Sequence, residues 1–194
     1  MVSAVVLAAG ASSRMGRQKL LLPLAGEPLV RRVVTRVSQA GFDDVLVVVG
    51  YEHDKILSAL EGLTVRHAVN PHYETGMGSS FRAAVSALPD SEAAMFALAD
   101  QPLLAAADYR SLLDTYRTCS AGIVSVRYGE VTAPPHLFDR RFFPELANLA
   151  HGARPVLQRH LADTTILRFS ADLLLDVDTQ EDYERAKELA RDGK

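Results

Sequence analysis

Residues 2–19 read Val2-Ser3-Ala4-Val5-Val6-Leu7-Ala8-Ala9 followed by Gly10-Ala11-Ser12-Ser13-Arg14-Met15-Gly16-Arg17-Gln18-Lys19. The apolar run predicts a buried strand, and a small, glycine-bracketed loop after such a strand is typical of nucleotide phosphate sites in α/β proteins. Glycines let backbone N–H groups turn toward an anion, so we expect backbone donors from Gly10, Ala11 and Ser12. Arg14 and Lys19 would supply the countercharge, which makes both of them candidate catalytic residues.

The glycine spacing excludes two well-known phosphate-binding loops. A P-loop has four residues between its glycines and a Lys-Ser/Thr pair after the second, whereas here five residues separate Gly10 from Gly16 and Arg17 follows. The tighter glycine spacing of the dinucleotide fingerprint is also absent. The structural alternative is a tight turn between a strand and a helix.

The loop as a whole resembles the signature loop of the nucleotidyltransferase superfamily. The residues that carry the resemblance are Leu7-Ala8-Ala9-Gly10, Ser12, Arg14-Met15-Gly16 and Lys19. Members of that superfamily move a nucleoside monophosphate from a nucleoside triphosphate onto a phosphorylated acceptor. The resemblance implies that residues 7–12, Arg14 and Lys19 bind the nucleotide.

Composition indicates one globular domain over residues 1–194. Hydrophobic residues make up 48% and charged residues 23%, and the net charge of -3 gives no reason to expect binding to nucleic acid or to a membrane. The apolar stretch at residues 2–9 lacks a basic lead-in and ends in a glycine loop, so we interpret it as a strand and expect a cytoplasmic protein. A single cysteine, Cys119, excludes an internal disulfide and is interpreted as a bystander thiol.

Apolar runs alternate with amphipathic stretches along most of the chain. This alternation predicts a three-layer, Rossmann-like α/β fold, with a mostly parallel sheet and helices on both faces. Strands are expected at 2–9, 45–49, 64–68, 93–99, 122–126 and 165–169, with an apolar run at 173–177. Helices are expected at 29–37, 54–60, 81–88, 106–118, 141–149, 155–161 and after 177, and the segment around Pro134-Pro135 is expected to be irregular. Ligands of such folds bind beyond the carboxyl ends of the strands.

A second loop, residues 70–80, ends in Gly76-Met77-Gly78-Ser79-Ser80 before a helix. Ser79 or Ser80 is suited to cap that helix. Backbone N–H groups and hydroxyls at a helix start also suit the base or ribose of a nucleotide, and Gly78 would keep the approach free of a Cβ. We therefore assign Gly78, Ser79 and Ser80 to nucleotide binding.

Two acidic segments follow apolar runs. Asp100 comes after the run 95–99, at the place where Mg²⁺ is held in phosphate-transfer enzymes, although an Asp followed by Gln-Pro also suits a turn. Asp176 and Asp178 follow the run 173–175, and in an extended chain they would project to the same side. We expect Asp178 to be the second metal ligand. Because Asp178 could instead cap the last helix, Asp176 is kept as the alternate ligand.

Along nearly the whole chain the motifs resemble those of the molybdenum cofactor cytidylyltransferases. The shared segments, in order, are the first loop, Asn70-Pro71 with Gly76-Met77-Gly78-Ser79-Ser80, Ala99-Asp100-Gln101-Pro102, Gly152-Ala153-Arg154 and Asp176-Val177-Asp178-Thr179 with Asp182-Tyr183. The resemblance implies transfer of CMP from CTP to the terminal phosphate of molybdopterin, with Mg²⁺ as cofactor and pyrophosphate as product. It also implies a molybdenum hydroxylase, or the chaperone of one, as partner.

The acceptor side matches that family less closely. Many relatives carry Gly-Asp where this chain has Ala150-His151. Arg154 is the candidate for the acceptor phosphate, because a guanidinium pairs with phosphate through two parallel hydrogen bonds, and His136 is a second acceptor candidate. The alternatives are another base such as guanine, a sugar or alditol phosphate acceptor, or a non-catalytic nucleotide-binding module that delivers cofactor.

Overall fold

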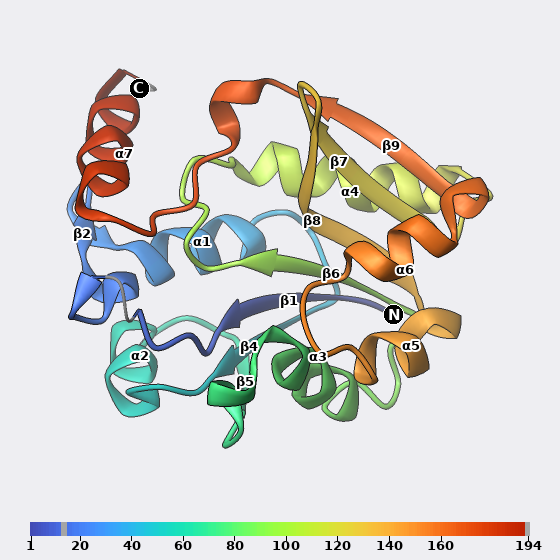
Figure 1. The fold of residues 1–194 in the computed structure, drawn as a ribbon, viewed down its shortest axis with the longest axis horizontal. Coiled ribbons are helices and arrows are strands. Elements are labelled where there is room, and N and C mark those ends of the chain that lie inside the picture. Colours follow the sequence, from blue (N-terminus) through green and yellow to red (C-terminus); the bar gives the residue numbers. More distant parts are fainter. Residues whose placement is uncertain (13–14, 193–194) are drawn as a thin grey trace.

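The fold is built around one sheet, in which seven strands of the described residues follow the order β5-β4-β1-β6-β8-β7-β9. The computed structural model describes residues 1–12 and 15–192 (Figure 1). β1, β4, β5 and β6 are parallel to one another, β8 is antiparallel to β6 and β7, and β9 is parallel to β7. The strands are β1 Val2–Ala8, β4 Asp44–Val49, β5 Arg66–Val69, β6 Ala93–Leu98, β7 Ile123–Tyr128, β8 Val131–Asp139 and β9 Thr164–Phe169, with a separate pair, β2 Pro23–Leu24 and β3 Glu27–Pro28.

Helices cover both faces of the sheet. The α-helices are α1 Leu29–Ser38, α2 His53–Ala59, α3 Met77–Ser86, α4 Ala106–Thr118, α5 Phe143–Ala147, α6 Arg154–Arg159 and α7 Gln180–Asp192. Short 3-10 helices span Lys19–Leu21, Tyr73–Thr75, Arg140–Phe142, Leu161–Asp163 and Ala171–Leu173. Apolar residues of α1, α2 and α4 form one core with the sheet, and those of α3, α5 and α6 form a second core on the other face. The three-layer, mostly parallel α/β fold is thereby confirmed.

The alternation of side chains along β1 explains this layering. Every residue of β1 is buried, and Ala4 and Val6 join the first core while Val5 and Leu7 join the second. A strand between two parallel neighbours, with helices on both faces, has no polar side to present, hence the continuous apolar run. α7 packs separately, near the β2–β3 pair, where its Tyr183 and Ala186, with Val177 just before the helix, share a third core with Leu24.

One expectation about the sheet is wrong. The segment around Pro134-Pro135, expected to be irregular, is part of the nine-residue strand β8. Proline lacks an N–H donor, so the sequence argued against a central strand there. β8 pairs with β6 only from His136 onward, and with β7 across a register irregularity at Ser125/Val126, which accommodates the two prolines.

The chain after Phe169 also differs from expectation. The apolar run 173–177 is not a strand: a 3-10 turn, Ala171–Leu173, leads into an irregular segment that carries Asp176 and Asp178. None of the helices in the described residues is long and apolar enough to cross a bilayer.

Candidate active site

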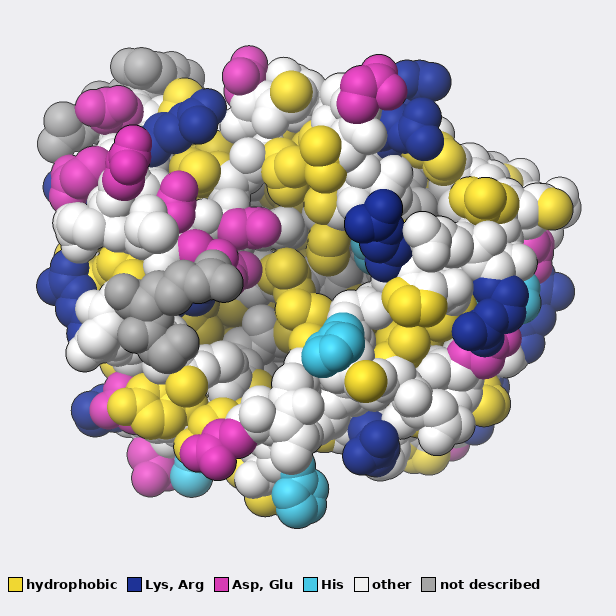
Figure 2. All heavy atoms as spheres, in the orientation of Figure 1, with side chains coloured by type: hydrophobic (Ala, Val, Ile, Leu, Met, Phe, Trp, Pro, Cys, Tyr) yellow, Lys and Arg dark blue, Asp and Glu magenta, His cyan; other side chains and the backbone are white. Residues whose placement is uncertain are grey.

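A cavity of about 360 Å³ lies beyond the carboxyl ends of β1 and β6. Figure 2 shows this face of the molecule hollowed near its centre, with acidic side chains gathered at the rim. The first loop, the second loop and both acidic segments contribute to the walls. The lining residues are Leu7, Ala8, Ala9, Gly10, Ser12, Lys19, Leu20, Tyr73, Gly76, Met77, Ser80, Leu98, Asp100 and Asp178.

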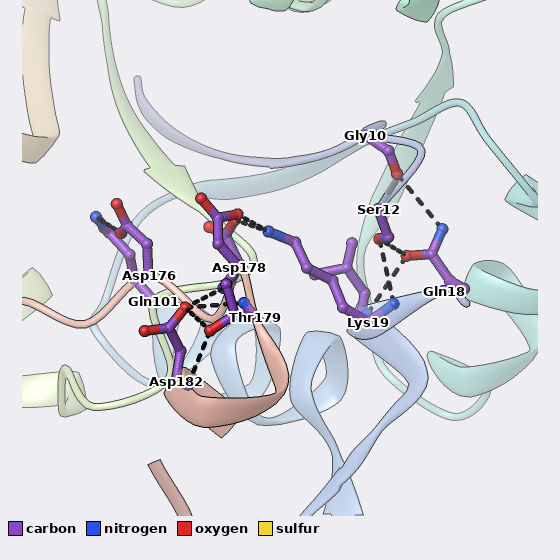
Figure 3. A network of polar contacts seen from close by, with 11 residues as sticks. Gly10, Ser12, Gln18, Lys19, Gln101, Asp176, Asp178, Thr179 and Asp182 are labelled. Atoms are coloured by element: carbon purple, nitrogen blue, oxygen red, sulfur yellow. Dashed lines mark hydrogen bonds and ion pairs between the residues drawn. The ribbon is translucent and has the colours of Figure 1, made fainter. Parts of the chain in front are cut away.

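The Lys19 ammonium bridges two carboxylates in this cavity. Its Nζ lies 2.6 Å from Asp100 Oδ2 and 2.7 Å from Asp178 Oδ1. Figure 3 shows Lys19 pointing toward Asp178. The Lys19 side chain is 11% exposed, against 20% for Asp100 and 41% for Asp178. Burial by itself lowers the pKa of Lys19, but the nearby charges and hydrogen bonds of the two aspartates outweigh it and raise that pKa above 10.5. Lys19 is therefore a fixed positive charge at neutral pH.

The first loop is held in shape by the buried side chain of Gln18. Ser12 Oγ donates to Gln18 Oε1 at 2.9 Å, and Gln18 Nε2 lies 3.5 Å from Gly10 O and 3.3 Å from Tyr51 O. The backbone N of Lys19 in turn donates to Ser12 Oγ at 3.2 Å. These bonds connect the start and the end of the loop, so the network fixes the base of the Lys19 side chain against β1 (Figure 3).

The two acidic segments are joined through the backbone. Val177 N donates to Asp100 O at 3.0 Å, so the two segments run side by side. At the start of α7, Thr179 and Asp182 form a reciprocal cap, with Thr179 N donating to Asp182 Oδ2 at 2.8 Å and Asp182 N donating to Thr179 Oγ1 at 3.1 Å. The capping box lies one residue later than expected, which leaves the Asp178 carboxylate directed at Lys19.

Asp176 faces a different partner from Asp178. Its Oδ1 accepts a hydrogen bond from Gln101 Nε2 at 2.8 Å, and it does not line the cavity. Burial, with repulsion from Asp100 and Asp178, raises the pKa of Asp176. The geometry therefore favours Asp178 over Asp176 as the second ligand of a cation beside Asp100.

In the second loop, Ser80 and not Ser79 lines the cavity. Asn70 Nδ2 donates to Ser79 Oγ at 2.8 Å and to Ser80 Oγ at 3.0 Å, while Ser79 Oγ donates to the backbone oxygen of Gly76. The Cα of Gly78 packs against the backbone of Leu149 and Ala150, and a Cβ there would lie 1.8 Å from Leu149 O. Its missing side chain therefore serves the packing of α3, and nucleotide binding by Gly78 stays a prediction.

Several lining residues were not predicted. Tyr73, Met77 and Leu98 form part of the wall, and Gln18 and Asn70 hold the two loops from behind. Tyr73 could have been suspected from its place in the second loop, but the anchoring amides carry no local signal. Ala11 does not line the cavity. Arg14, predicted to be catalytic, lies outside the described residues.

A second cavity, of about 670 Å³, adjoins the first and shares Leu7, Met77 and Leu98 with it. Its other lining residues are Phe81, Phe96, Arg127, Glu130, Val131, Thr132, Pro134, His136, Gly152, Ala153, Arg154, Leu157, Gln158 and Leu161. Both predicted acceptor residues, His136 and Arg154, are among them. Burial lowers the pKa of His136 to about 3, so its imidazole is neutral and its Nδ1 shares a hydrogen with Ser125 Oγ at 3.0 Å.

The residues beside Lys19 fit a magnesium ion. Within residues 1–12 and 15–192, no three His, Cys, Asp or Glu side chains gather as a metal cluster. Mg²⁺ needs no such cage, because one or two carboxylates suffice when phosphate oxygens and water complete its octahedron. Asp100 and Asp178 already enclose a cationic group, the Lys19 ammonium, and would be the protein ligands.

Several known proteins are similar to this chain in sequence and in architecture. The family description of the MobA-like NTP transferase domain matches residues 4–165. A nucleotidyl transferase from Methanothermobacter (Mth528) has 25% identity and a TM-score of 0.88, covering 100% of this chain and 99% of its own. Rv0371C of Mycobacterium tuberculosis, solved as a complex with manganese, has 30% identity and a TM-score of 0.81, covering 96% of this chain and 98% of its own.

Among curated proteins, the nicotine blue oxidoreductase of Paenarthrobacter nicotinovorans is 31% identical over 159 residues, which are 78% of this chain and 77% of that protein. The bifunctional protein GlmU of Sorangium cellulosum is 39% identical over 112 residues, but the match covers only 24% of that longer protein. The family match spans most of the chain and includes residues 4–8 of β1 and the cavity-lining residues of the first loop. The chain therefore belongs to the family of MobA-like NTP transferase domains.

Proposed function

We propose that this chain transfers CMP from CTP to the terminal phosphate of molybdopterin, with Mg²⁺, and releases pyrophosphate. The observation that carries the transfer chemistry is the Lys19–Asp100–Asp178 cluster in the wall of the first cavity. Two carboxylates suit the binding of a metal ion, and a lysine with a raised pKa suits the neutralisation of the triphosphate charge. The preference for CTP and for the pterin rests on the sequence motifs.

Positioning and electrostatics supply the rate in this scheme. The acceptor phosphate is already ionised at neutral pH, so no strong general base is needed. Lys19 neutralises charge on the phosphate that is attacked, and Arg14 is assigned to the remaining phosphates. Asp100 and Asp178 would hold Mg²⁺, which would supply Lewis-acid chemistry at the phosphates. In this scheme Lys19 would exchange one of its carboxylate partners for a phosphate oxygen when the nucleotide binds.

The nucleoside would lie toward the second loop. Ser80 Oγ, fixed by Asn70, can donate its hydrogen to the base or ribose, and backbone groups of residues 8–10 line the same wall. The acceptor would enter from the second cavity, whose shared wall of Leu7, Met77 and Leu98 brings its phosphate toward Lys19. Delivery of the product to a molybdenum hydroxylase or its chaperone would follow.

The direct test is transfer of label from α-³²P-CTP to molybdopterin, with GTP, and with sugar or alditol phosphates, as competing substrates. Asp178→Asn and Asp100→Asn should each reduce turnover by about a hundredfold or more, whereas Asp176→Asn should stay within about tenfold of the wild type. GTP or a sugar phosphate as the better substrate would replace the assigned base or acceptor. Nucleotide binding without any transfer would favour the delivery module.

An oxidoreductase activity is the second candidate, favoured by the identity to the Paenarthrobacter protein over most of its length. Hydride transfer from a nicotinamide cofactor relies on the cofactor's own chemistry and needs no acid pair for a metal. Oxidation of NADH or NADPH with a quinoid dye as acceptor would reveal it. That activity should persist in Asp100→Asn and Asp178→Asn, which separates it from nucleotidyl transfer.

A further inference from the structure

We propose that Arg127 forms an anion-binding subsite in the second cavity, for an anionic group of the acceptor other than the phosphate that reacts, for which Arg154 remains the candidate. The subsite itself rests on geometry, and only its assignment to the acceptor substrate rests on the proposed function. It assigns to Arg127 a role in selecting an acceptor that has a flat heteroaromatic body and a second negative charge.

The position of Arg127 follows from the way the sheet divides at its carboxyl edge. β8 pairs with β6 only over residues 136–139, because Pro134 and Pro135 have no N–H to donate. Beyond that point β7 and β8 continue as a hairpin, in which Arg127 pairs with Thr132. The second cavity lies against this hairpin, and both Arg127 and Thr132 line it.

The face on which Arg127 lies also follows from the register. Ile123, Ser125 and Arg127 alternate along β7, so Arg127 shares the face of Ile123, which packs in the core under α3, α5 and α6. On this face Ser125 contacts His136, the neutral imidazole of the cavity wall. Arg127 is thus a cation placed at the end of an otherwise neutral or apolar row.

The charges around Arg127 are unbalanced. Its Nε is buried without a hydrogen-bond partner, and within the described residues neither Arg127 nor Arg154 forms an ion pair. The register places Arg168 of β9 directly beside Arg127, and adjacent like charges on paired strands repel. Glu130 is the one acidic side chain among the residues that line this cavity. A buried donor without a partner is unfavourable, so an anion at Arg127 would satisfy it.

The rest of the wall fits a flat, heteroaromatic body. Phe81 and Phe96 pack together with ring centroids 4.9 Å apart, and Leu157 and Pro134 also line the cavity. Aromatic and aliphatic walls with a few placed polar groups are typical of sites for small heteroaromatic molecules. His136 offers one neutral hydrogen-bonding atom to such a ring.

The subsite is separate from the nucleotide cavity. Arg127 and Arg154 do not line the first cavity, whose charged lining residues in the described part of the chain are Lys19, Asp100 and Asp178. β7 lies two strands beyond β6 in the sheet, which is roughly 10 Å at the usual strand spacing. The first cavity therefore suits a metal-bound triphosphate, and the second suits an anion without a metal.

The test is a fluorescence titration of the full chain with two probes that share one ring: pterin-6-carboxylate and the neutral 6-methylpterin. The wild type should bind the carboxylate at least about tenfold more tightly, which is the effect of a charge-assisted hydrogen bond. Arg127→Met should abolish this preference and leave 6-methylpterin binding unchanged. Arg127→Lys, which keeps the charge but loses the planar guanidinium, should retain part of it.

Arg185→Met, on α7 and outside the lining of both cavities, is the matched control and should behave as the wild type. Calorimetric binding of CTP with Mg²⁺ verifies that each variant is folded, and saturating CTP should leave the affinity for the carboxylate unchanged. Equal binding of the two probes by the wild type, an unchanged preference in Arg127→Met, or displacement of the probe by CTP would each overturn the subsite. A preserved preference in a protein that transfers no CMP would refute the proposed function and leave the subsite standing.

Discussion

Replacement of Lys19 by methionine removes one charge and keeps most of the side-chain volume. Removal of one partner from a buried ion pair costs about 3–5 kcal/mol, and from an exposed pair about 0–1 kcal/mol. Lys19 is largely buried but Asp178 is 41% exposed, so we expect Lys19→Met to lose about 2 kcal/mol of the free energy of unfolding. For a chain of 194 residues this lowers the Tm by roughly 4–8 °C.

The pH dependence of this loss follows from the raised pKa of Lys19. A raised pKa in the folded state means that the stabilisation is fully present below the unfolded value of 10.5 and disappears only as the pH rises through the folded value. The difference in Tm between wild type and Lys19→Met should therefore be constant from pH 7 to pH 9. It should narrow only in strongly alkaline solution.

Magnesium provides the sharper readout. In the wild type without nucleotide, the ammonium competes with Mg²⁺ for Asp100 and Asp178; in Lys19→Met the two carboxylates are left facing each other. Thermal unfolding without nucleotide should then show a larger rise in Tm with Mg²⁺ for Lys19→Met than for the wild type, because a ligand of the folded state raises its stability. Turnover should nevertheless remain about a hundredfold or more below the wild type at saturating Mg²⁺.

Lys187→Met is the control, since Lys187 pairs with Glu184 on the surface of α7 and its loss should change stability by less than about 1 kcal/mol. A Lys19→Met protein as stable as the wild type, or one that Mg²⁺ stabilises no more than the wild type, would refute a cation site between Asp100 and Asp178.

Two further predictions separate structural roles from ligand binding. Gly78→Ala should lower the free energy of unfolding by at least about 3 kcal/mol in a denaturant titration, because the new Cβ would lie 1.8 Å from Leu149 O. Gly10→Ala, which has open space around its Cβ, should stay within about 1 kcal/mol of the wild type. Equal stabilities of the two variants would contradict the packing role of Gly78. Because the pKa of His136 falls from 6.5 to about 3 on folding, stability is present above pH 6.5 and is lost as the pH falls toward 3. At pH 5 protonation of His136 in the unfolded state lowers the free energy of unfolding of the wild type by about 2 kcal/mol. Between pH 7.5 and pH 5 the loss of stability should therefore be about 2 kcal/mol smaller in His136→Asn than in the wild type. Parallel pH profiles of the two proteins would contradict a buried neutral imidazole.

The proximity of Lys19, Asp100 and Asp178 could be predicted from the sequence because each of the three carries a local signal. Lys19 ends the loop after β1 and Asp100 follows β6, and the carboxyl ends of these parallel strands meet at one edge of the sheet. Asp178 reaches the same edge without a strand, because Val177 hydrogen-bonds to the backbone of Asp100. The types of the three residues then indicated phosphate and metal chemistry. The second ligand stayed open between Asp176 and Asp178 because the choice depends on which residue caps α7, and that cap is displaced by one position.

What the sequence did not predict depends on contacts between distant segments. Gln18 and Asn70 are ordinary polar residues until the fold buries them behind the two loops. β8 was not predicted because prolines in a sheet are usually confined to edge strands and bulges. The register irregularity that accommodates Pro134 and Pro135 arises only when β7 and β8 pair, so the sequence of β8 alone does not reveal it. Arg127 became a candidate only once the hairpin placed it beside the second cavity.

The most direct measurement of the central claim is calorimetric binding of CTP, GTP, UTP and ATP to the purified protein, each with and without Mg²⁺. The account predicts that CTP binds most tightly, that Mg²⁺ strengthens its binding, and that Asp100→Asn removes the effect of the metal. Tighter binding of GTP would move the assignment to guanylyl transfer with the same loop roles. CTP binding that is insensitive both to Mg²⁺ and to Asp100→Asn would contradict the account.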